Sequence, residues 1–248
     1  TGLGDNGSFN ISGNSLRANA SFDFETKSVY SITVRATDSG GLTLDRVFTI
    51  NVTDVNETPT SIELSNNSLA ENAGANAVVG VLSGTDPDAG DSLTFTLPTG
   101  LGDNGSFNIS GNSLRADVSF DFETKSVYSI TVRATDSGGL TLDRVFTINV
   151  TDVNETPTSI DLSNSSLAEN AGANAVLGVL SGTDPDAGDS LTFTLPTGLG
   201  DNGSFNISGN SLRANASFDF ETKSVYSITV RATDSGGLTL DRVFTINV

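Results

Sequence analysis

The stretch VYSITVRATD at residues 127–136 alternates apolar and polar side chains. Tyr128, Ile130, Val132 and Ala134 fall on one face of an extended chain, and the polar residues between them fall on the other. This period of two is typical of a strand in an antiparallel sheet with one buried face. The stretch therefore predicts β structure.

The sequence around this strand is repeated. The run TGLGDNGSFNISGNSLRA begins at Thr1, Thr99 and Thr197, so the period is 98 residues (99 − 1 and 197 − 99). A unit of this size is too long for one turn of a solenoid and matches a small domain with its own core. The near-identity of the copies indicates recent duplication within a longer array.

Further alternating segments divide each repeat into short strands, and no segment has a convincing helical period. Turn-forming Asn, Asp, Pro and Gly residues separate them. Seven short strands in about a hundred residues predict an all-β Greek-key β-sandwich of immunoglobulin-like type. The expected strands lie near residues 61–64, 77–83, 92–97, 106–109, 113–117, 127–134 and 142–150.

Pro59 and Pro157 stand where one sandwich is expected to lead into the next. The expected organisation is 1–58 as the second half of a domain with its linker, 59–156 as a complete domain, and 157–248 as a domain without its exit linker. The first segment lacks the opening strands. We interpret it as an excerpt of a longer tandem polymer, with completion by another chain as the alternative.

Composition limits the chemistry that the chain can perform. The formal charge is −18, so nucleic acid and anionic membranes are poor partners. Cysteine and histidine are both absent, which removes disulfides, thiolate metal sites and the usual general base. A bound metal must then be held by oxygen atoms, which favours a hard cation such as calcium. No stretch is long enough to span a bilayer.

Acidic motifs recur in a fixed order in each complete repeat. In the first of these repeats they are AEN at 70–72, TDPDAGD at 85–91, FDFETK at 120–125, RATDSGG at 133–139 and DVNE at 152–155. Together with the apolar strands, this order resembles the cadherin extracellular repeat, in the form common in bacterial surface proteins. The resemblance covers the full length of each repeat.

The resemblance implies calcium ions at the junction between consecutive domains. At residues 151–157 the implied ligands are Glu71, Asp121, Glu123, Asp152, Asn154, Glu155, Asp184, Asp186 and Asp234. At residues 53–59 they are Asp23, Glu25, Asp54, Asn56, Glu57, Asp86, Asp88 and Asp136. Glu169, Asp219 and Glu221 form a further half site.

The linker departs from the family pattern in one respect. Animal cadherins usually have Asp-x-Asn-Asp-Asn-x-Pro, whereas this chain has Asp-Val-Asn-Glu-Thr-Pro at residues 152–157. Two or three ions per junction both fit this motif. Each ion takes about 6–8 oxygens, and modules of this extracellular kind bind calcium with dissociation constants of about 10⁻⁴–10⁻³ M.

Other readings of the same residues are weaker. Acidic loops can be a solvated surface, and Asp86-Pro87-Asp88 can be an ordinary turn. Asp121 and Glu123 could suggest a glycosidase pair, but they recur in every copy, and no histidine is present to activate a serine or threonine. The chain is therefore not expected to be an enzyme.

The resulting prediction is an extracellular, calcium-rigidified stalk or filament at the cell surface. Expected partners are neighbouring repeats of the same long chain, with other copies and cell-surface ligands as further candidates. The alternative is an adhesin module that contacts a carbohydrate or a protein directly. Against it, the chain lacks Trp and has one Tyr per repeat, which falls on the buried face.

Overall fold

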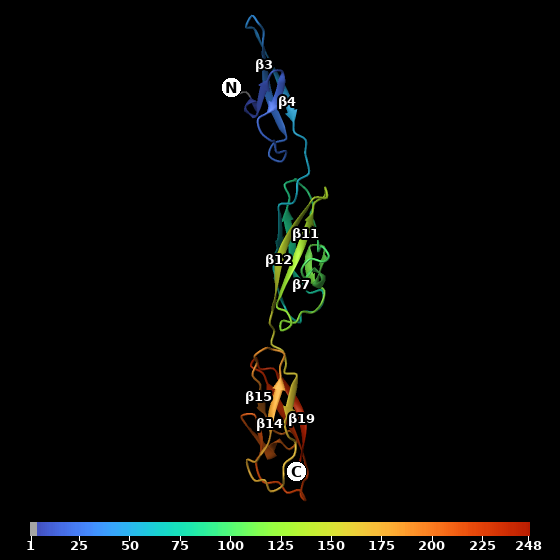
Figure 1. Cartoon of the computed structure of the whole chain (residues 1–248), viewed down its shortest axis with the longest axis vertical. Coiled ribbons are helices and arrows are strands. Elements are labelled where there is room, and N and C mark those ends of the chain that lie inside the picture. Colours follow the sequence, from blue (N-terminus) through green and yellow to red (C-terminus); the bar gives the residue numbers. More distant parts are fainter. Residues whose placement is uncertain (1–3) are drawn as a thin grey trace. The chain divides into compact units, whose positions relative to one another are not determined.

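The computed structural model describes residues 4–248 and is built from β-strands and short turns (Figure 1). The chain divides into two compact units. The first unit runs to Leu69 and adds Ala73–Ser119 and Val127–Asn149, and the second contains Ala70–Asn72, Phe120–Ser126 and Val150–Val248. The predicted all-β architecture is confirmed.

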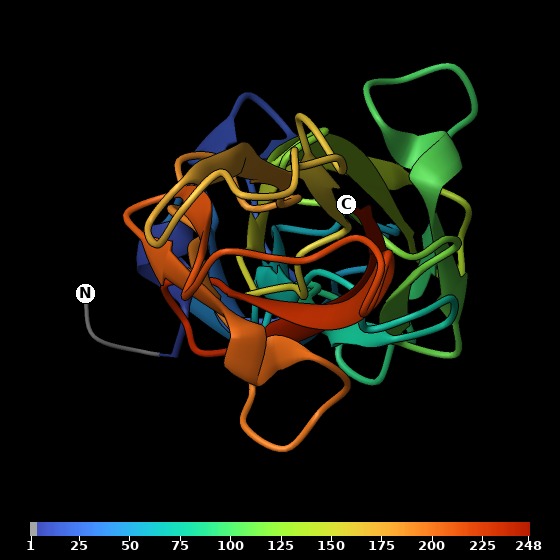
Figure 2. The ribbon, with the colours of Figure 1, turned by 90° about the horizontal axis from the view of Figure 1, so that it is seen from below.

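The second unit contains a complete β-sandwich. One sheet has the order β13-β14-β17-β16 and the other the order β15-β18-β19. Figure 2 shows the gold strand β14 and the red strands β18 and β19 on opposite sides of a common interior. The strands are β13 (Ser159–Leu162), β14 (Val176–Thr183), β15 (Thr192–Thr194), β16 (Phe205–Ser208), β17 (Ser211–Ala214), β18 (Val225–Thr233) and β19 (Thr239–Asn247).

The core of this sandwich is formed by the side chains that alternation places inward. Along β18, Ile228, Val230 and Ala232 are fully buried, while their neighbours in the strand are half-buried or exposed. Ile160 and Leu212 reach the same core from the other sheet. Burial of one face of each strand is therefore what holds the two sheets together.

The first unit contains the strands of the preceding repeat. They are β5 (Ser61–Leu64), β6 (Ser68–Ala70), β7 (Val78–Thr85), β8 (Thr94–Thr96), β9 (Phe107–Ser110), β10 (Ser113–Ala116), β11 (Val127–Thr135) and β12 (Thr141–Thr151), of which Ala70 and the end of β12 belong to the second unit. The sheets have the orders β5-β7-β10-β9 and β6-β12-β11-β8. All seven expected strands are present, and β6 is an additional one.

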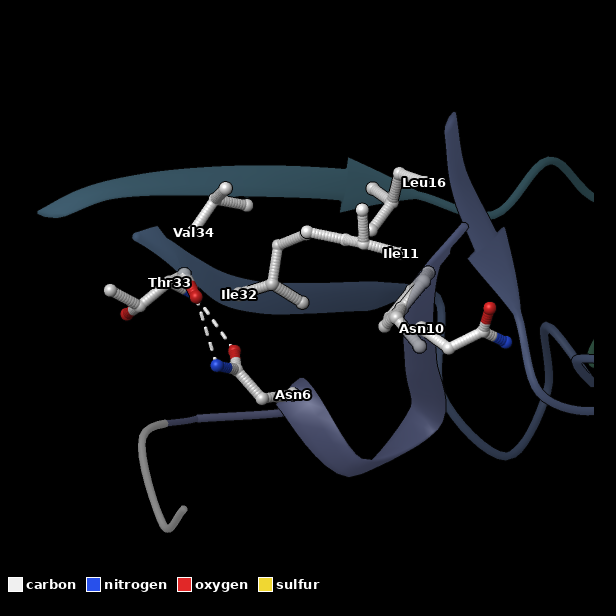
Figure 3. Close-up of a pocket in the computed structure, with 8 residues that line it drawn as sticks. Asn6, Asn10, Ile11, Leu16, Ile32, Thr33 and Val34 are labelled. Carbon is white, nitrogen blue, oxygen red and sulfur yellow. Dashed lines mark hydrogen bonds between the residues drawn. The ribbon is translucent and has the colours of Figure 1, made fainter. Parts of the chain in front are cut away.

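The segment before this repeat forms two separate two-stranded sheets. They are β1 (Phe9–Ser12) with β2 (Ser15–Ala18), and β3 (Val29–Thr37) with β4 (Thr43–Asn51). Figure 3 shows Ile11, Leu16 and Ile32 from these strands gathered around one pocket.

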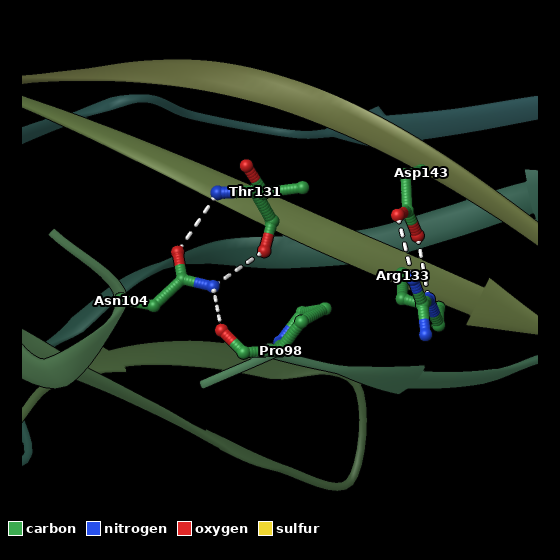
Figure 4. Close-up of polar contacts among 5 residues, drawn as sticks. All are labelled: Pro98, Asn104, Thr131, Arg133 and Asp143. Atoms are coloured by element: carbon green, nitrogen blue, oxygen red, sulfur yellow. Dashed lines mark hydrogen bonds and ion pairs between the residues drawn. The ribbon is translucent and has the colours of Figure 1, made fainter. Parts of the chain in front are cut away.

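Two polar contacts fix the strands of the first unit in register (Figure 4). Arg133 and Asp143 lie opposite each other on β11 and β12, and the guanidinium donates hydrogen bonds of 2.7 and 2.8 Å to the carboxylate. In the η2 turn (Asn104–Ser106), buried Asn104 donates to the carbonyls of Pro98 and Thr131 and accepts the Thr131 N–H. The turn is thereby tied to the centre of β11.

Candidate metal centre

The first acidic cluster brings together carboxylates from three separate segments. Glu25 comes from the loop between β2 and β3, Asp54 and Glu57 from the linker after β4, and Asp88 from the turn after β7. One oxygen from each side chain lies within 4.8 Å of those of the others. All four residues belong to the first unit. The arrangement is one that a single cation could bridge.

Hydrogen bonds hold the linker against the turn that carries Asp88. The Glu57 N–H donates to Asp88 Oδ2 at 2.8 Å, and the side chain of Asn56 donates to Asp136 Oδ2 at 3.0 Å. Gly138 is required beside this contact, because a Cβ there would lie 1.9 Å from Asn56 Oδ1. Gly138, the first of the two glycines in RATDSGG, therefore leaves room for the side chain of Asn56 in the linker.

The second cluster lies entirely within the second unit. Oxygens of Glu71, Glu123 and Glu155 lie within 4.8 Å of one another, and those of Glu123, Asp152 and Asp186 form an adjoining group. Glu123 belongs to both groups. The carboxylates of this cluster come from residues 70–72, from the loop at 120–126, from the linker and from the turn after β14.

Glu71 is the most deeply placed member of this cluster, with 3% of its surface exposed. Its Oε2 accepts the Phe122 N–H at 2.7 Å and its Oε1 accepts the Val153 N–H at 2.8 Å. Asn72 follows with φ of 56°, and its side chain donates to Glu155 Oε1. Glu71 thus joins the loop at residues 120–126 to the linker.

The linker of the second cluster repeats the contacts of the first. The Glu155 N–H donates to Asp186 Oδ2 at 2.8 Å, and Asn154 donates to Asp234 Oδ2 at 3.0 Å. A Cβ on Gly236 would lie 1.9 Å from Asn154 Oδ1. The same local sequence therefore builds the same arrangement twice.

Burial and the crowding of negative charge both perturb the pKa values of these acids. Burial, together with the charges of Glu71, Asp186 and Glu123, raises the pKa of Glu155 to about 7. Burial and neighbouring carboxylates also raise the pKa of Glu57, Glu123 and Asp152 above the usual values of such groups. Both clusters are therefore strained by mutual repulsion when every carboxylate is ionised.

Several carboxylate oxygens in the two clusters and in the adjoining turns after β7 and β14 are buried without a hydrogen-bond donor among the described residues. They are Glu57 Oε2, Asp86 Oδ2, Asp91 Oδ2, Glu155 Oε2 and Asp184 Oδ2. A buried, unpaired carboxylate oxygen is costly unless a cation or a donor faces it. These donor sets are all-oxygen, which fits a hard divalent cation such as calcium.

Some expected ligands have other contacts. Asp23 and Asp121 each accept the backbone N–H and the hydroxyl of the threonine three residues later. These bonds lower the pKa of both carboxyls. Glu169, Asp219 and Glu221 come within 4.8 Å of one another, and all three are exposed.

One acid in the turn after β7 was not assigned from the sequence. Asp91 groups with Asp86 and Asp88 within 4.8 Å and accepts the Ser137 hydroxyl. Asp91 could have been found from the sequence, since it is the third acid of the run DPDAGD at residues 86–91. A tight turn in this run brings its last residue close to its first. Asp184, Asp186 and Asp189 occupy the same positions in the following repeat.

Comparison with known proteins identifies the fold. The family described as "Putative Ig domain" matches residues 58–151 and 156–248. Human protocadherin Fat 4 is 32% identical over 227 residues, covering 86% of this chain, and human protocadherin beta-1 is 31% identical over 254 residues, covering 94%. The chain spans only 4% and 31% of the length of these two relatives.

A solved structure supports the same assignment. The protocadherin gammaB7 EC3-6 cis-dimer structure has a TM-score of 0.72 and 23% identity, covering all of this chain and 63% of that one. No helix within residues 4–248 is long and apolar enough to cross a lipid bilayer. Cadherins are extracellular adhesion proteins rather than enzymes. The chain belongs to the "Putative Ig domain" family, and its relatives identify its domains as cadherin repeats.

Proposed function

We propose that the chain is a calcium-stiffened segment of an extracellular stalk or filament that acts in adhesion or surface assembly. The observation that carries the proposal is the convergence of carboxylates from a loop, a linker and a turn in each of two clusters. The turn and the loop belong to different repeats in the proposed domain organisation. A shared cation would therefore hold consecutive repeats together.

The energetic argument concerns repulsion between the acids. Two unit charges 4 Å apart repel by about 1 kcal/mol in water and about 4 kcal/mol where the effective dielectric constant is about 20. Burial first, and then the charges of Glu71, Asp186 and Glu123, raise the pKa of Glu155 to about 7. Bound calcium supplies positive charge that neutralises the cluster. The residues proposed to hold the calcium ion in the second unit are Glu71, Glu123, Asp152 and Asp186.

The proposed repeats are 59–156 and 157–248, preceded by the partial repeat 1–58, whose residues 1–3 lie outside the described residues. The family matches at 58–151 and 156–248 support these limits. Proposed partners are neighbouring repeats, other copies of the chain and cell-surface ligands. The alternative function is direct binding of a carbohydrate or protein, and a glycan array or cell-binding assay with this chain separates the two.

Small-angle X-ray scattering tests the proposal when it is recorded with millimolar calcium and then with a chelator. We expect a narrow distribution of particle dimensions with calcium and a broader one after chelation. Asp88→Asn removes a charge from the first cluster and is expected to raise the calcium concentration needed for stiffening. Asp117→Asn is the matched control, because positions 19 and 215 of the other repeats already carry Asn. Identical profiles with and without calcium contradict the proposal.

A further inference from the structure

The acceptor motif for N-linked glycans, Asn-x-Ser/Thr with any residue except proline in the middle, recurs throughout the chain. Attachment of a glycan replaces one of the two hydrogens on the side-chain nitrogen of the asparagine, and the bulky sugar needs open space beyond that nitrogen. The fold therefore decides which motifs can carry a glycan. The asparagines that begin such a motif are Asn6, Asn10, Asn19, Asn51, Asn56, Asn66, Asn104, Asn108, Asn149, Asn154, Asn164, Asn202, Asn206 and Asn215.

Most of these asparagines already use their side-chain nitrogen to hold the fold together. Buried Asn104 is the clearest case, because its nitrogen donates to the carbonyls of Pro98 and Thr131 at 2.7 and 2.9 Å (Figure 4). The nitrogen of Asn66 also donates to two backbone carbonyls, both at 2.7 Å. A sugar on either nitrogen would have to lie where the backbone of the same repeat lies.

Exposure of the side chain is not enough to free the nitrogen. Asn215 is exposed, yet its nitrogen donates to the carbonyls of Gly203 and Phe205 at 2.9 and 3.0 Å. Both of its hydrogens are engaged, so a glycan would break one of these bonds and press against β16. The side-chain nitrogen also donates a hydrogen bond in Asn6, Asn10, Asn19, Asn56, Asn108, Asn154, Asn164, Asn202 and Asn206.

Asn51 and Asn149 are the two exceptions. Within residues 4–248 neither side chain makes a hydrogen bond, and both side chains are exposed. They occupy the same position in successive repeats, 98 residues apart (149 − 51), and each begins the sequence Asn-Val-Thr. Two copies of the fold thus leave the same amide free.

The strand that carries Asn149 turns this side chain away from the core. The flanking Ile148 and Val150 on β12 are 0% and 3% exposed, so alternation places Asn149 on the opposite, solvent-facing side. Its cross-strand partner on β11 is Val127, which is 52% exposed. A sugar on Asn149 would therefore extend into solvent.

We propose that Asn51 and Asn149 are N-glycosylation sites and that the other motifs stay unmodified in the folded chain. The donor is a saccharide activated as a diphosphate. Its anomeric carbon forms a bond to the side-chain nitrogen while the bond from that carbon to the diphosphate oxygen breaks. The diphosphate leaves with the electron pair, and a base of the transferase takes the amide proton.

The test directs the full 248-residue chain through the secretory pathway of cultured animal cells, which supplies a lipid-linked oligosaccharide donor. The mass of the secreted chain before and after digestion with peptide N-glycosidase gives the number of glycans. Peptide mapping gives their positions, because the digestion leaves Asp in place of each glycosylated Asn. We expect two glycans per chain, on Asn51 and Asn149.

Variants of the chain assign each glycan to its motif. Asn149→Gln should lose one glycan and keep the one on Asn51. Thr151→Ala removes the same motif without changing Asn149 and should have the same effect, so a folding defect in one variant does not decide the result. Asn215→Asp is the matched control, because the equivalent position 117 already carries Asp, and this variant should keep both glycans.

Two outcomes overturn the proposal. Absence of a glycan from Asn51 or Asn149 shows that a free, exposed amide in this strand is not an acceptor. A glycan on Asn66, Asn104 or Asn215 in the secreted chain shows that the fold does not select the sites. Neither outcome depends on calcium, so the proposed function of the acidic clusters keeps its own test.

Discussion

Substitution of Glu71 by Gln probes how the loop at residues 120–126 is joined to the linker. The carboxylate accepts two backbone N–H groups, from Phe122 and Val153. The glutamine side chain has one carbonyl oxygen, which accepts, and one amide NH2 group, which only donates. At least one of the two backbone N–H groups therefore loses its acceptor. Hydrogen bonds to charged groups contribute about 1.5–3 kcal/mol each. At about 1.4 kcal/mol per factor of ten, the affected amide should exchange about ten- to a hundredfold faster.

Amide hydrogen exchange measured residue by residue is the appropriate assay, in chelator to separate this effect from calcium. Removal of one charge also relieves about 1 kcal/mol of repulsion from each close carboxylate in water. This gain partly offsets the lost hydrogen bond in the free energy of global unfolding, so a measurement at single residues is needed. Glu169→Gln is the matched control, because Glu169 is exposed and accepts the Phe220 N–H only at 3.4 Å. Unchanged protection of both Phe122 and Val153 in the Glu71→Gln variant would refute the reasoning.

Two further predictions concern the same clusters. Because the pKa of Glu155 is raised from 4.5 to about 7, the folded chain binds more protons than the unfolded chain between these values. Its metal-free stability should therefore fall as pH rises from about 5 to 7.5, and thermal unfolding that shows a rise instead contradicts this. Gly138→Ala should displace Asn56 from Asp136 and weaken calcium binding, because the added Cβ meets Asn56 Oδ1 at 1.9 Å. A calcium titration that matches the unchanged chain contradicts this second prediction.

The sequence predicts the long strands well because their alternation is unbroken. The expected strand at 127–134 is found as β11 (Val127–Thr135), and that at 142–150 as β12 (Thr141–Thr151). The short strand β6 (Ser68–Ala70) was missed. It carries a single large apolar residue, Leu69, in an Asn- and Ser-rich stretch, and its conformation depends on pairing with β12 rather than on its own pattern.

The candidate site is less fully readable from sequence. The order and spacing of the acids predict which loops would carry ligands, but not which of their oxygens already accept hydrogen bonds. Asp121 uses its carboxylate on the backbone and hydroxyl of Thr124, whereas Asp91 turns towards Asp86 and Asp88. These differences arise from how each loop closes in three dimensions. The ligand roles of the named acids therefore remain predictions.

Whether a given apolar residue is buried depends on the strands that cover it and not on its local sequence. Leu16 and Leu212 have identical neighbours in the chain, yet one is 42% exposed and the other is fully buried. Burial is a property of the covering strands, which lie far away in the sequence. A repeat therefore has to be considered as a whole before its core residues can be identified.

A crystal structure grown in millimolar calcium, with anomalous diffraction to identify the ion, tests the central claim most directly. We predict anomalous peaks about 2.3–2.6 Å from carboxylate oxygens of Glu25, Asp54 and Asp88, and equivalent peaks beside Glu123 and Asp186. Ordinary water density between these carboxylates, with no anomalous signal at either linker, would contradict the account.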